Sequence, residues 1–160
     1  MKKILVAVAC MAVFLSAHLG VFAAPESLPV DATGNSNGLV VVTKPKNQKE
    51  TTFDDSYTIS GYGMGGTTVA LYRYNVDDHV YEKFYTEAKS IDANGGSQVL
   101  RTASETTIGS SGLFMSTIVL DQGDNTIIVR AENGDKIQLL RLDIKKYNYT
   151  IIDLIKSLRS

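Results

Sequence analysis

The chain has 160 residues, of which 44% are hydrophobic and 21% are charged. This length fits one domain of ordinary size with appendages, and it excludes a two-domain enzyme. The composition is that of a globular protein, so neither a disordered chain nor a collagen-like repeat is expected. The 16 basic residues nearly balance the 17 acidic ones.

The first residues have the pattern of a secretory signal peptide. Lys2 and Lys3 precede an apolar stretch at 4–15, and Val21-Phe22-Ala23 places tolerated residues before a cleavage point after Ala23 or Ala24. Ser16, His18 and Gly20 interrupt the apolar character of the chain after residue 15, which argues against a retained membrane span of about 20 residues. We therefore predict residues 1–23 to be a signal peptide, and the mature protein to be extracellular or on the cell surface without a stable membrane span.

Cleavage changes the composition of the chain that folds. Removal of Lys2 and Lys3 leaves 14 basic against 17 acidic residues, a net charge of about −3, which disfavours nucleic acid as a partner. Cys10 and His18 leave as well, so the mature chain has no thiol and a single imidazole, that of His79. Without disulfides, a secreted domain must be stabilised by its core or by bound ions.

The mature chain reads as a leader followed by short strands. Residues 24–38 combine Pro, Gly, Asn and Ser without apolar periodicity, which predicts a flexible leader. Beyond them, strands are predicted at 39–43, 57–60, 67–75, 80–86, 112–120, 125–132 and 136–145, with a further short strand at 98–102. Turns are predicted at 61–66, 76–79, 92–96, 121–124 and 133–135, the last because Asn-Gly accepts a positive φ at low cost.

This spacing predicts the fold class. About seven strands, with a turn every 8–12 residues and no long helix between them, indicate an all-β antiparallel β-sandwich over residues 39–147. Alternation along the strands predicts a set of buried core residues, which are Ile59, Val69, Leu71, Ile127, Val129, Leu140 and Leu142.

In the last segment, 148–160, the spacing of the apolar residues changes from that of a strand to that of a helix. Ile151, Leu154, Ile155 and Leu158 fall on one helical face, which predicts a short amphipathic helix. We expect it to dock on its own domain; a groove of a partner protein and a membrane surface are the alternatives.

Four segments also resemble the recurring motifs of bacterial immunoglobulin-like domains of secreted and surface proteins. They are Val42–Asn47, Tyr57–Gly61, Gly66–Tyr72 and Gly123–Ala131, and the likeness covers residues 39–145. The resemblance implies an immunoglobulin-like β-sandwich that serves display, spacing or binding, and it assigns no catalytic residue. The length of the 87–107 stretch departs from the family pattern, so the number of strands there is left open.

The sequence offers no catalytic constellation. A multi-histidine zinc site is excluded because His79 stands alone in a predicted turn. Ser110-Ser111 does not match the Gly-x-Ser-x-Gly nucleophile motif, and Gly61–Gly66 lacks the Lys-Ser/Thr of a phosphate-binding loop. We therefore expect a protein that is not an enzyme.

Calcium is the one ion that the loops suggest. Grouped carboxylates lie in predicted loops at Asp54-Asp55, Asp77-Asp78 and Asp121/Asp124, and Ca²⁺ takes 6–8 oxygen ligands. Acidic turn residues more often satisfy backbone donors, so no cofactor is expected beyond a weak possibility of structural calcium.

The tyrosines form the most interesting polar-aromatic set. If Val69 and Leu71 face the core, Tyr72 and Tyr74 stand on the outer face of their strand, with Tyr81 and Tyr85 beside them. Such a row is a possible binding face, because tyrosine offers a flat apolar body with a hydroxyl at its rim. The simpler interpretation is a cross-strand ladder that stabilises the hairpin.

These observations favour a secreted, non-catalytic immunoglobulin-like module with a binding or structural role, whose partner is an unknown protein or a cell-wall glycan. The alternatives are a carbohydrate- or cell-wall-binding domain that uses an exposed tyrosine face, and a subunit of a surface or spore-coat layer.

Overall fold

The structure is a computed structural model that describes residues 24–91 and 97–148. This part of the chain is all-β, and none of its segments is a helix long and apolar enough to cross a bilayer. The described strands are β1 (Ser27–Pro29), β2 (Val40–Lys44), β3 (Lys49–Thr52), β4 (Ser56–Gly63), β5 (Thr68–Asn75), β6 (Val80–Lys83), β7 (Tyr85–Ile91), β8 (Ser97–Ala103), β9 (Glu105–Thr107), β10 (Leu113–Val119), β11 (Gly123–Asn133) and β12 (Lys136–Lys146).

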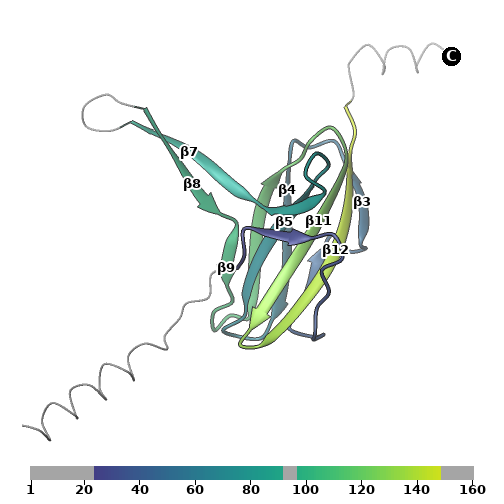
Figure 1. The fold of residues 1–160 in the computed structure, drawn as a ribbon, viewed down its shortest axis with the longest axis vertical. Helices are drawn as coiled ribbons and strands as arrows, with labels where there is room; N and C mark the ends of the chain where they lie inside the picture. Colours follow the sequence, from purple (N-terminus) through teal and green to yellow (C-terminus); the bar gives the residue numbers. More distant parts are fainter. Residues whose placement is uncertain (1–23, 92–96, 149–160) are drawn as a thin grey trace, which may run out of the picture.

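Two sheets form the body of the molecule (Figure 1). The larger has the order β1-β6-β5-β11-β12-β3, with β9 also paired to β5, and the smaller has the order β10-β4-β2. Pairing is antiparallel in every described ladder except β12–β3, which is parallel. The long β11–β12 hairpin turns at Asn133-Gly134, where Gly134 has a φ of 63°, as the sequence predicted.

A common core lies between the two sheets. Ile59 and Phe114 come from the small sheet, and Leu71, Ile127 and Val129 come from the large one. The predicted core is confirmed: Ile59, Val69, Leu71, Ile127, Val129 and Leu142 are buried, and Leu140 is half-buried against the same cluster. The strand phases inferred from alternation are therefore right, and the arrangement is that of a β-sandwich.

The N-terminal segment is not a flexible leader. β1 pairs with β6 at the edge of the large sheet, and Leu28 lies opposite Tyr81 in that ladder. Asn35 anchors the following residues, because its backbone N–H donates to Ile137 O and its side chain donates to Asp135 O. The polar composition suggested a linker, but one buried leucine and these hydrogen bonds hold the segment across the sheet.

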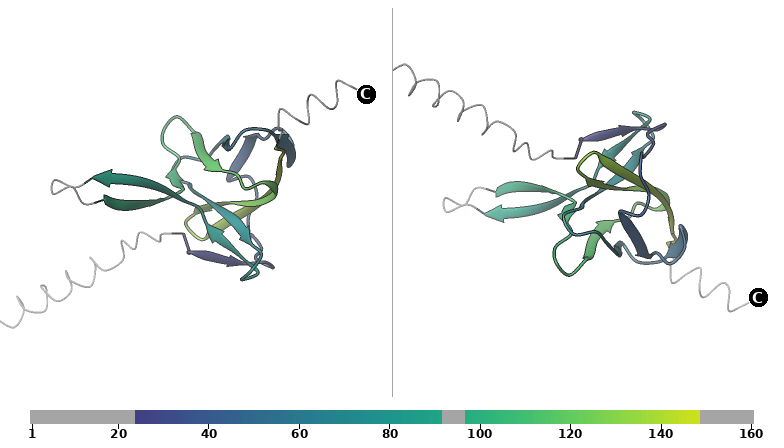
Figure 2. Two further views of the ribbon diagram at one scale, coloured as in Figure 1. Left: turned by 90° about the horizontal axis from the view of Figure 1, so that it is seen from above. Right: turned by 90° about the horizontal axis from the view of Figure 1, so that it is seen from below.

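The stretch between β6 and β10 leaves the body. The predicted strand at 80–86 divides at Phe84 into β6 and β7, and the predicted strand at 98–102 is part of β8. β7 and β8 pair with each other as a two-stranded arm that projects from the sandwich (Figure 2). The chain then returns through β9, which pairs with β5.

Two further predictions need correction. Gly61 and Gly63 belong to β4 rather than to a turn, and they pair with Val42 and Val40 of β2. Glycine suits position 61 because a Cβ there would lie 2.1 Å from Val41 O in the neighbouring strand. The turn itself is shorter and contains Gly66, with a φ of 80°. Residues 49–52, where no strand was predicted, form β3. The predicted signal peptide, the 92–96 turn and the C-terminal helix lie outside the described residues, apart from Asn148, which is not helical.

Candidate functional site

The four tyrosines do not form an open row. Tyr72 is 0% exposed and Tyr81 is 8% exposed, so the prediction of an exposed face is wrong for both. They do lie on the side of the large sheet away from the main core, but Ala24, Leu28 and Ile128 pack with them in a second cluster. Tyr74 is half-buried against Tyr81, with 5.4 Å between the ring centroids, and Tyr85 is also half-buried. The simpler interpretation, a cross-strand aromatic contact, describes Tyr74 and Tyr81.

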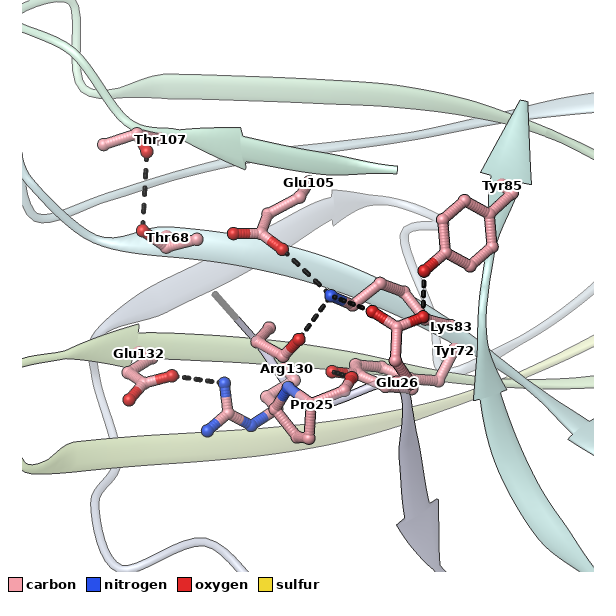
Figure 3. A network of polar contacts seen from close by, with 11 residues as sticks. Pro25, Glu26, Thr68, Tyr72, Lys83, Tyr85, Glu105, Thr107, Arg130 and Glu132 are labelled. Atoms are coloured by element: carbon pink, nitrogen blue, oxygen red, sulfur yellow. Dashed lines mark hydrogen bonds and ion pairs between the residues drawn. The ribbon is translucent and has the colours of Figure 1, made fainter. Parts of the chain in front are cut away.

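A buried lysine holds the N-terminal segment onto the sheet (Figure 3). The side chain of Lys83 in β6 is 2% exposed, and its ammonium donates to Ala24 O. The same ammonium lies 3.2 Å from a carboxylate oxygen of Glu105 in β9 and 3.6 Å from one of Glu26. The hydroxyl of Tyr85 donates to the other oxygen of Glu26. A buried ammonium is tolerated because each of its acceptors is supplied by the fold.

A second cation lies on the same side of the sheet. Arg130 in β11 has a side chain that is 8% exposed and pairs with Glu132 two residues along the strand. The hydroxyl of Tyr72 donates to Pro25 O at 2.7 Å. Burial raises the pKa of Tyr72 above its ordinary value, so the hydroxyl stays a donor. Neither Lys83 nor Arg130 was predicted to belong to a site, although Lys83 shares the phase of Tyr81 on β6 and Arg130 shares the phase of Ile128 on β11.

The outer side of the small sheet is apolar and open. Leu113 of β10, Tyr62 of β4 and Val41 of β2 lie side by side in one row of the ladders. Leu113 is 64% exposed, and further along β10 Met115 and Val119 are 68% and 69% exposed. We call these five residues the apolar face. The sequence carried a signal for it, since apolar residues occupy both phases of the 112–120 strand.

None of the residues that point outward from β4 and β10 is charged. The other outward positions are serines and threonines, and the hydroxyls of Thr58 and Thr117 bond across the two strands at 3.0 Å. Five partly exposed side chains of this size present on the order of 500 Å² of apolar surface, in the range where patches on monomers are often functional. Large exposed apolar surface without charge is typical of the centre of a protein interface.

Two clefts lie on the surface of the described part of the chain. One of about 670 Å³ runs along β3, β11 and β12, and its charged groups pair locally, Arg141 with Asp143 at 3.0 Å and Lys145 with Asp124 at 3.4 Å. Another, of about 580 Å³, lies at the root of the arm beside Phe84 and Val119. His79 hydrogen-bonds the hydroxyl of Tyr74 at 3.0 Å rather than a serine.

Two of the three acidic turns are engaged by the protein's own cations, and in the third Asp78 accepts a hydrogen bond from the Asn75 amide at 3.1 Å. Asp55 pairs with Lys146 at 2.7 Å, and Asp121 pairs with Arg73 at 2.6 Å. The Lys146 ammonium holds the pKa of Asp55 below its ordinary value through a hydrogen bond and through its charge. Within residues 24–91 and 97–148 no three His, Cys, Asp or Glu side chains come together as a metal site.

Comparison with protein-family models and with curated proteins finds no match for this chain.

Proposed function

We propose that the protein is a secreted immunoglobulin-like module without catalytic activity, and that it acts by self-association through the apolar face. The apolar face is the observation that carries the self-association. The secretion part rests on the charged start, the apolar stretch and the small residues at 23 and 24.

The strand order supports the immunoglobulin-like part. In that fold, strands A, B and E share one sheet, strands C, F and G share the other, and variable-type domains add C′ beside C. Here β2, β4 and β10 form the small sheet, while β5, β11 and β12 are neighbours in the large sheet with β6 beside β5. In chain order, β2, β4, β5, β6, β10, β11 and β12 therefore take the places of strands A, B, C, C′, E, F and G in the two sheets, and the arm occupies the part of the chain where strand D would follow C′.

A second copy suits the apolar face for two reasons. The outward residues of β4 and β10 carry no charge, and the one charged residue in the strands of the small sheet, Lys44, lies at the end of β2 away from Leu113 and Tyr62, so two copies meet around these two residues without like-charge repulsion. A standard interface buries about 800 Å² per partner, which the apolar face and the surrounding threonines and serines approach. A two-fold axis through the row of Tyr62 and Leu113 brings the same residues together from both copies.

The carbohydrate-binding alternative loses its surface in this structure. It required an exposed row of four tyrosines, and two of them are buried beneath the N-terminal segment. A layer subunit remains consistent with self-association, and it predicts assemblies larger than a dimer.

The test is the oligomeric state of the chain that begins at Ala24, measured by analytical ultracentrifugation from about 1 to 100 μM. We expect a concentration-dependent dimer for the unaltered chain and a monomer for Met115→Glu, because two carboxylates would be buried in the interface. Val76→Glu is the matched control. Val76 is 69% exposed, close to the 68% of Met115, but it lies in the β5–β6 turn, so the Val76→Glu chain should dimerise like the unaltered chain. A monomer at every concentration, or equal behaviour of both variants, would refute the interface.

Secretion is tested separately, by locating the full-length chain in cell and medium fractions of an expressing bacterium. We expect the shortened chain outside the cytoplasm. Retention of the full-length chain in the cytoplasm would refute this part of the proposal without affecting the interface.

A further inference from the structure

Three of the four strands that end the two larger sheets have a protected outer edge. β1 has three residues and ends at Pro29, and β3 begins with the charged pair Lys49-Glu50. On β2 the Gln138 amide bonds both backbone groups of Val40, the N–H at 3.0 Å and the carbonyl at 3.1 Å. Short length, proline, charge and covered backbone groups each hinder the addition of another strand to an edge.

The fourth end strand, β10, is longer and plainer. Its seven residues include no charged residue and no proline, and its ladder with β4 runs without a register shift. It stands at the end of the three-stranded sheet, so one of its two edges has no neighbouring strand. A regular, uncharged edge of this length is a template for pairing with another chain.

The bonds at the two ends of the β10–β4 ladder show which backbone groups β10 turns toward this open edge. Gly63 N–H donates to Gly112 O at 2.9 Å, and Leu120 N–H donates to Asp55 O at 2.9 Å. Hydrogen-bonded pairs alternate with non-hydrogen-bonded pairs in an antiparallel ladder, so the even-numbered residues of β10 bond to β4. The odd-numbered residues turn their N–H and C=O groups to the open edge; they are Leu113, Met115, Thr117 and Val119.

The cleft of about 580 Å³ borders part of this edge. Thr117 and Val119 line it together with Phe84, Tyr85 and Thr86 at the root of the arm. Among the described residues, the backbone N–H groups of Thr117 and Val119 have no hydrogen-bond partner. An unpaired edge beside a cleft leaves room for one more strand.

The arm has a matching deficiency. β7 and β8 form a sheet of two strands, and an isolated two-stranded hairpin is at best marginally stable in water. The arm points away from its own body (Figures 1 and 2), so it does not lie along its own β10. β7, β8 and β10 have seven residues each, so their edges match in length at about 20 Å.

We propose that the arm of one copy adds as a further strand to the open β10 edge of a second copy, which returns the contact with its own arm. Backbone hydrogen bonds hold the added strand, as in other cases of strand addition to a sheet edge. Because the root of the arm lines the same cleft, donor and acceptor lie on one side of the molecule, and the exchange closes about a two-fold axis.

This exchange extends the proposed self-association to a second contact. The apolar face lies on the outer side of the small sheet, whereas an added strand lies in the plane of the sheet, so one copy accommodates both contacts. Two different two-fold contacts on one copy build an open-ended row, and this growth beyond a dimer rests on the proposed function. A single added strand buries less than a standard interface, so the exchange should need higher concentrations than the dimer of the apolar face.

Amide hydrogen exchange tests the contact at single residues in the chain that begins at Ala24. We expect Thr117 N–H to be protected at least ten-fold more at about 1 mM than at about 50 μM, because its partner strand is then bound. Ile118 N–H is the internal control: it bonds to β4 within one copy, so its protection should not depend on concentration.

Two variants separate the exchange from the apolar face. In the arm-shortened chain, Asn-Gly replaces residues 87–101 and joins Thr86 to Thr102, which are partners in the β7–β8 ladder. Thr117→Pro removes the outward N–H of the acceptor edge. Its matched control is Thr117→Val, which also loses the hydroxyl bond to Thr58 but keeps the N–H.

Light scattering at about 1 mM reads the size of the assemblies. We expect a mass of four copies or more for the unaltered chain and for Thr117→Val, and a dimer for Thr117→Pro and for the arm-shortened chain. The arm-shortened chain keeps every strand of the body, so it decides the question if Thr117→Pro does not fold.

Protection of Thr117 N–H that does not change with concentration, or growth of the arm-shortened chain beyond a dimer, would overturn the exchange. If the unaltered chain is a monomer up to about 100 μM, the apolar face fails as an interface. The exchange alone then predicts a dimer at about 1 mM that the arm-shortened chain does not form.

Discussion

Replacement of Tyr72 by phenylalanine isolates one hydrogen bond in the attachment of the N-terminal segment. The tyrosine is fully buried, and its hydroxyl donates to Pro25 O at 2.7 Å. Tyr72→Phe keeps the ring and its packing against Leu28 and Ile128, so it creates no large cavity. What is lost is the donor, and Pro25 O then has no partner from this side chain.

The magnitude follows from that geometry. A net hydrogen bond contributes about 0.5–1.5 kcal/mol, and an unsatisfied buried acceptor costs about 1–3 kcal/mol. Because the segment can open slightly and admit water to Pro25 O, we expect the lower part of this range, about 1–2 kcal/mol. With a urea m-value of about 1–3 kcal/mol/M, the midpoint should fall by roughly half to one molar at unchanged m.

Tyr57→Phe is the matched control. Tyr57 is also buried, at 5% exposure, but its hydroxyl has no hydrogen-bond partner among the described residues. Burial first, and then the hydrogen-bonding influence and the charge of the nearby Glu50 carboxylate, raise its pKa, although the two groups do not meet the geometry of a hydrogen bond. Removing an unpartnered buried hydroxyl should leave stability unchanged or raise it by up to about 1 kcal/mol. Urea unfolding at 25 °C checks both variants; a Tyr72→Phe midpoint equal to that of the unaltered chain would refute the anchoring contact.

Three further predictions follow from single positions. Ile127→Ala, at a side chain with 0% exposure, should cost about 2–4 kcal/mol in urea unfolding, and a loss below about 0.5 kcal/mol would contradict the strand phase. Lys146→Met should raise the pKa of Asp55 toward 3.8, which an NMR titration will measure. Because Lys146 lowers the pKa of Asp55 in the folded state, the ion pair stabilises the fold above about pH 4, and this stabilisation is lost as the pH falls through the pKa of Asp55 in the folded protein. Gly61→Ala should lower the melting temperature, since its Cβ would lie 2.1 Å from Val41 O, and an unchanged value would show that β2 can move aside.

Alternation predicted the orientation of the strands well. In β5 it placed Val69 and Leu71 toward the core and Tyr72 on the opposite side, and the structure has both. The Asn133-Gly134 turn was equally readable, because a positive φ is a local demand that few residues meet. Such features depend on neighbours in the chain, so they are present in a short window of sequence.

What covers the outer side of a sheet is not a local property. The leader has the composition of a linker, and Leu28 is the one leucine in it. Its burial depends on pairing with β6, about 50 residues later, and no periodicity in residues 24–38 reports that pairing. β3 was missed for a related reason: its polar Lys-Glu-Thr-Thr sequence pairs in parallel with the distant β12, and an edge strand needs no apolar face.

The burial of Lys83 could not be predicted from a short window of sequence. Lys83 finds Glu105 at a separation of 22 residues and Ala24 O at a separation of 59 residues, so its burial requires three segments to meet. Each residue alone reads as an ordinary surface charge, since lysine and glutamate are rarely buried unless they are paired. Once the segments meet, removal of any one partner leaves the others desolvated, which couples the N-terminal segment to β6 and β9. The apolar face differs from Lys83 in this respect: the alternation along β10 was readable from the sequence, whereas the exposure of Leu113, Met115 and Val119 depends on whether another layer covers the outer side of the small sheet.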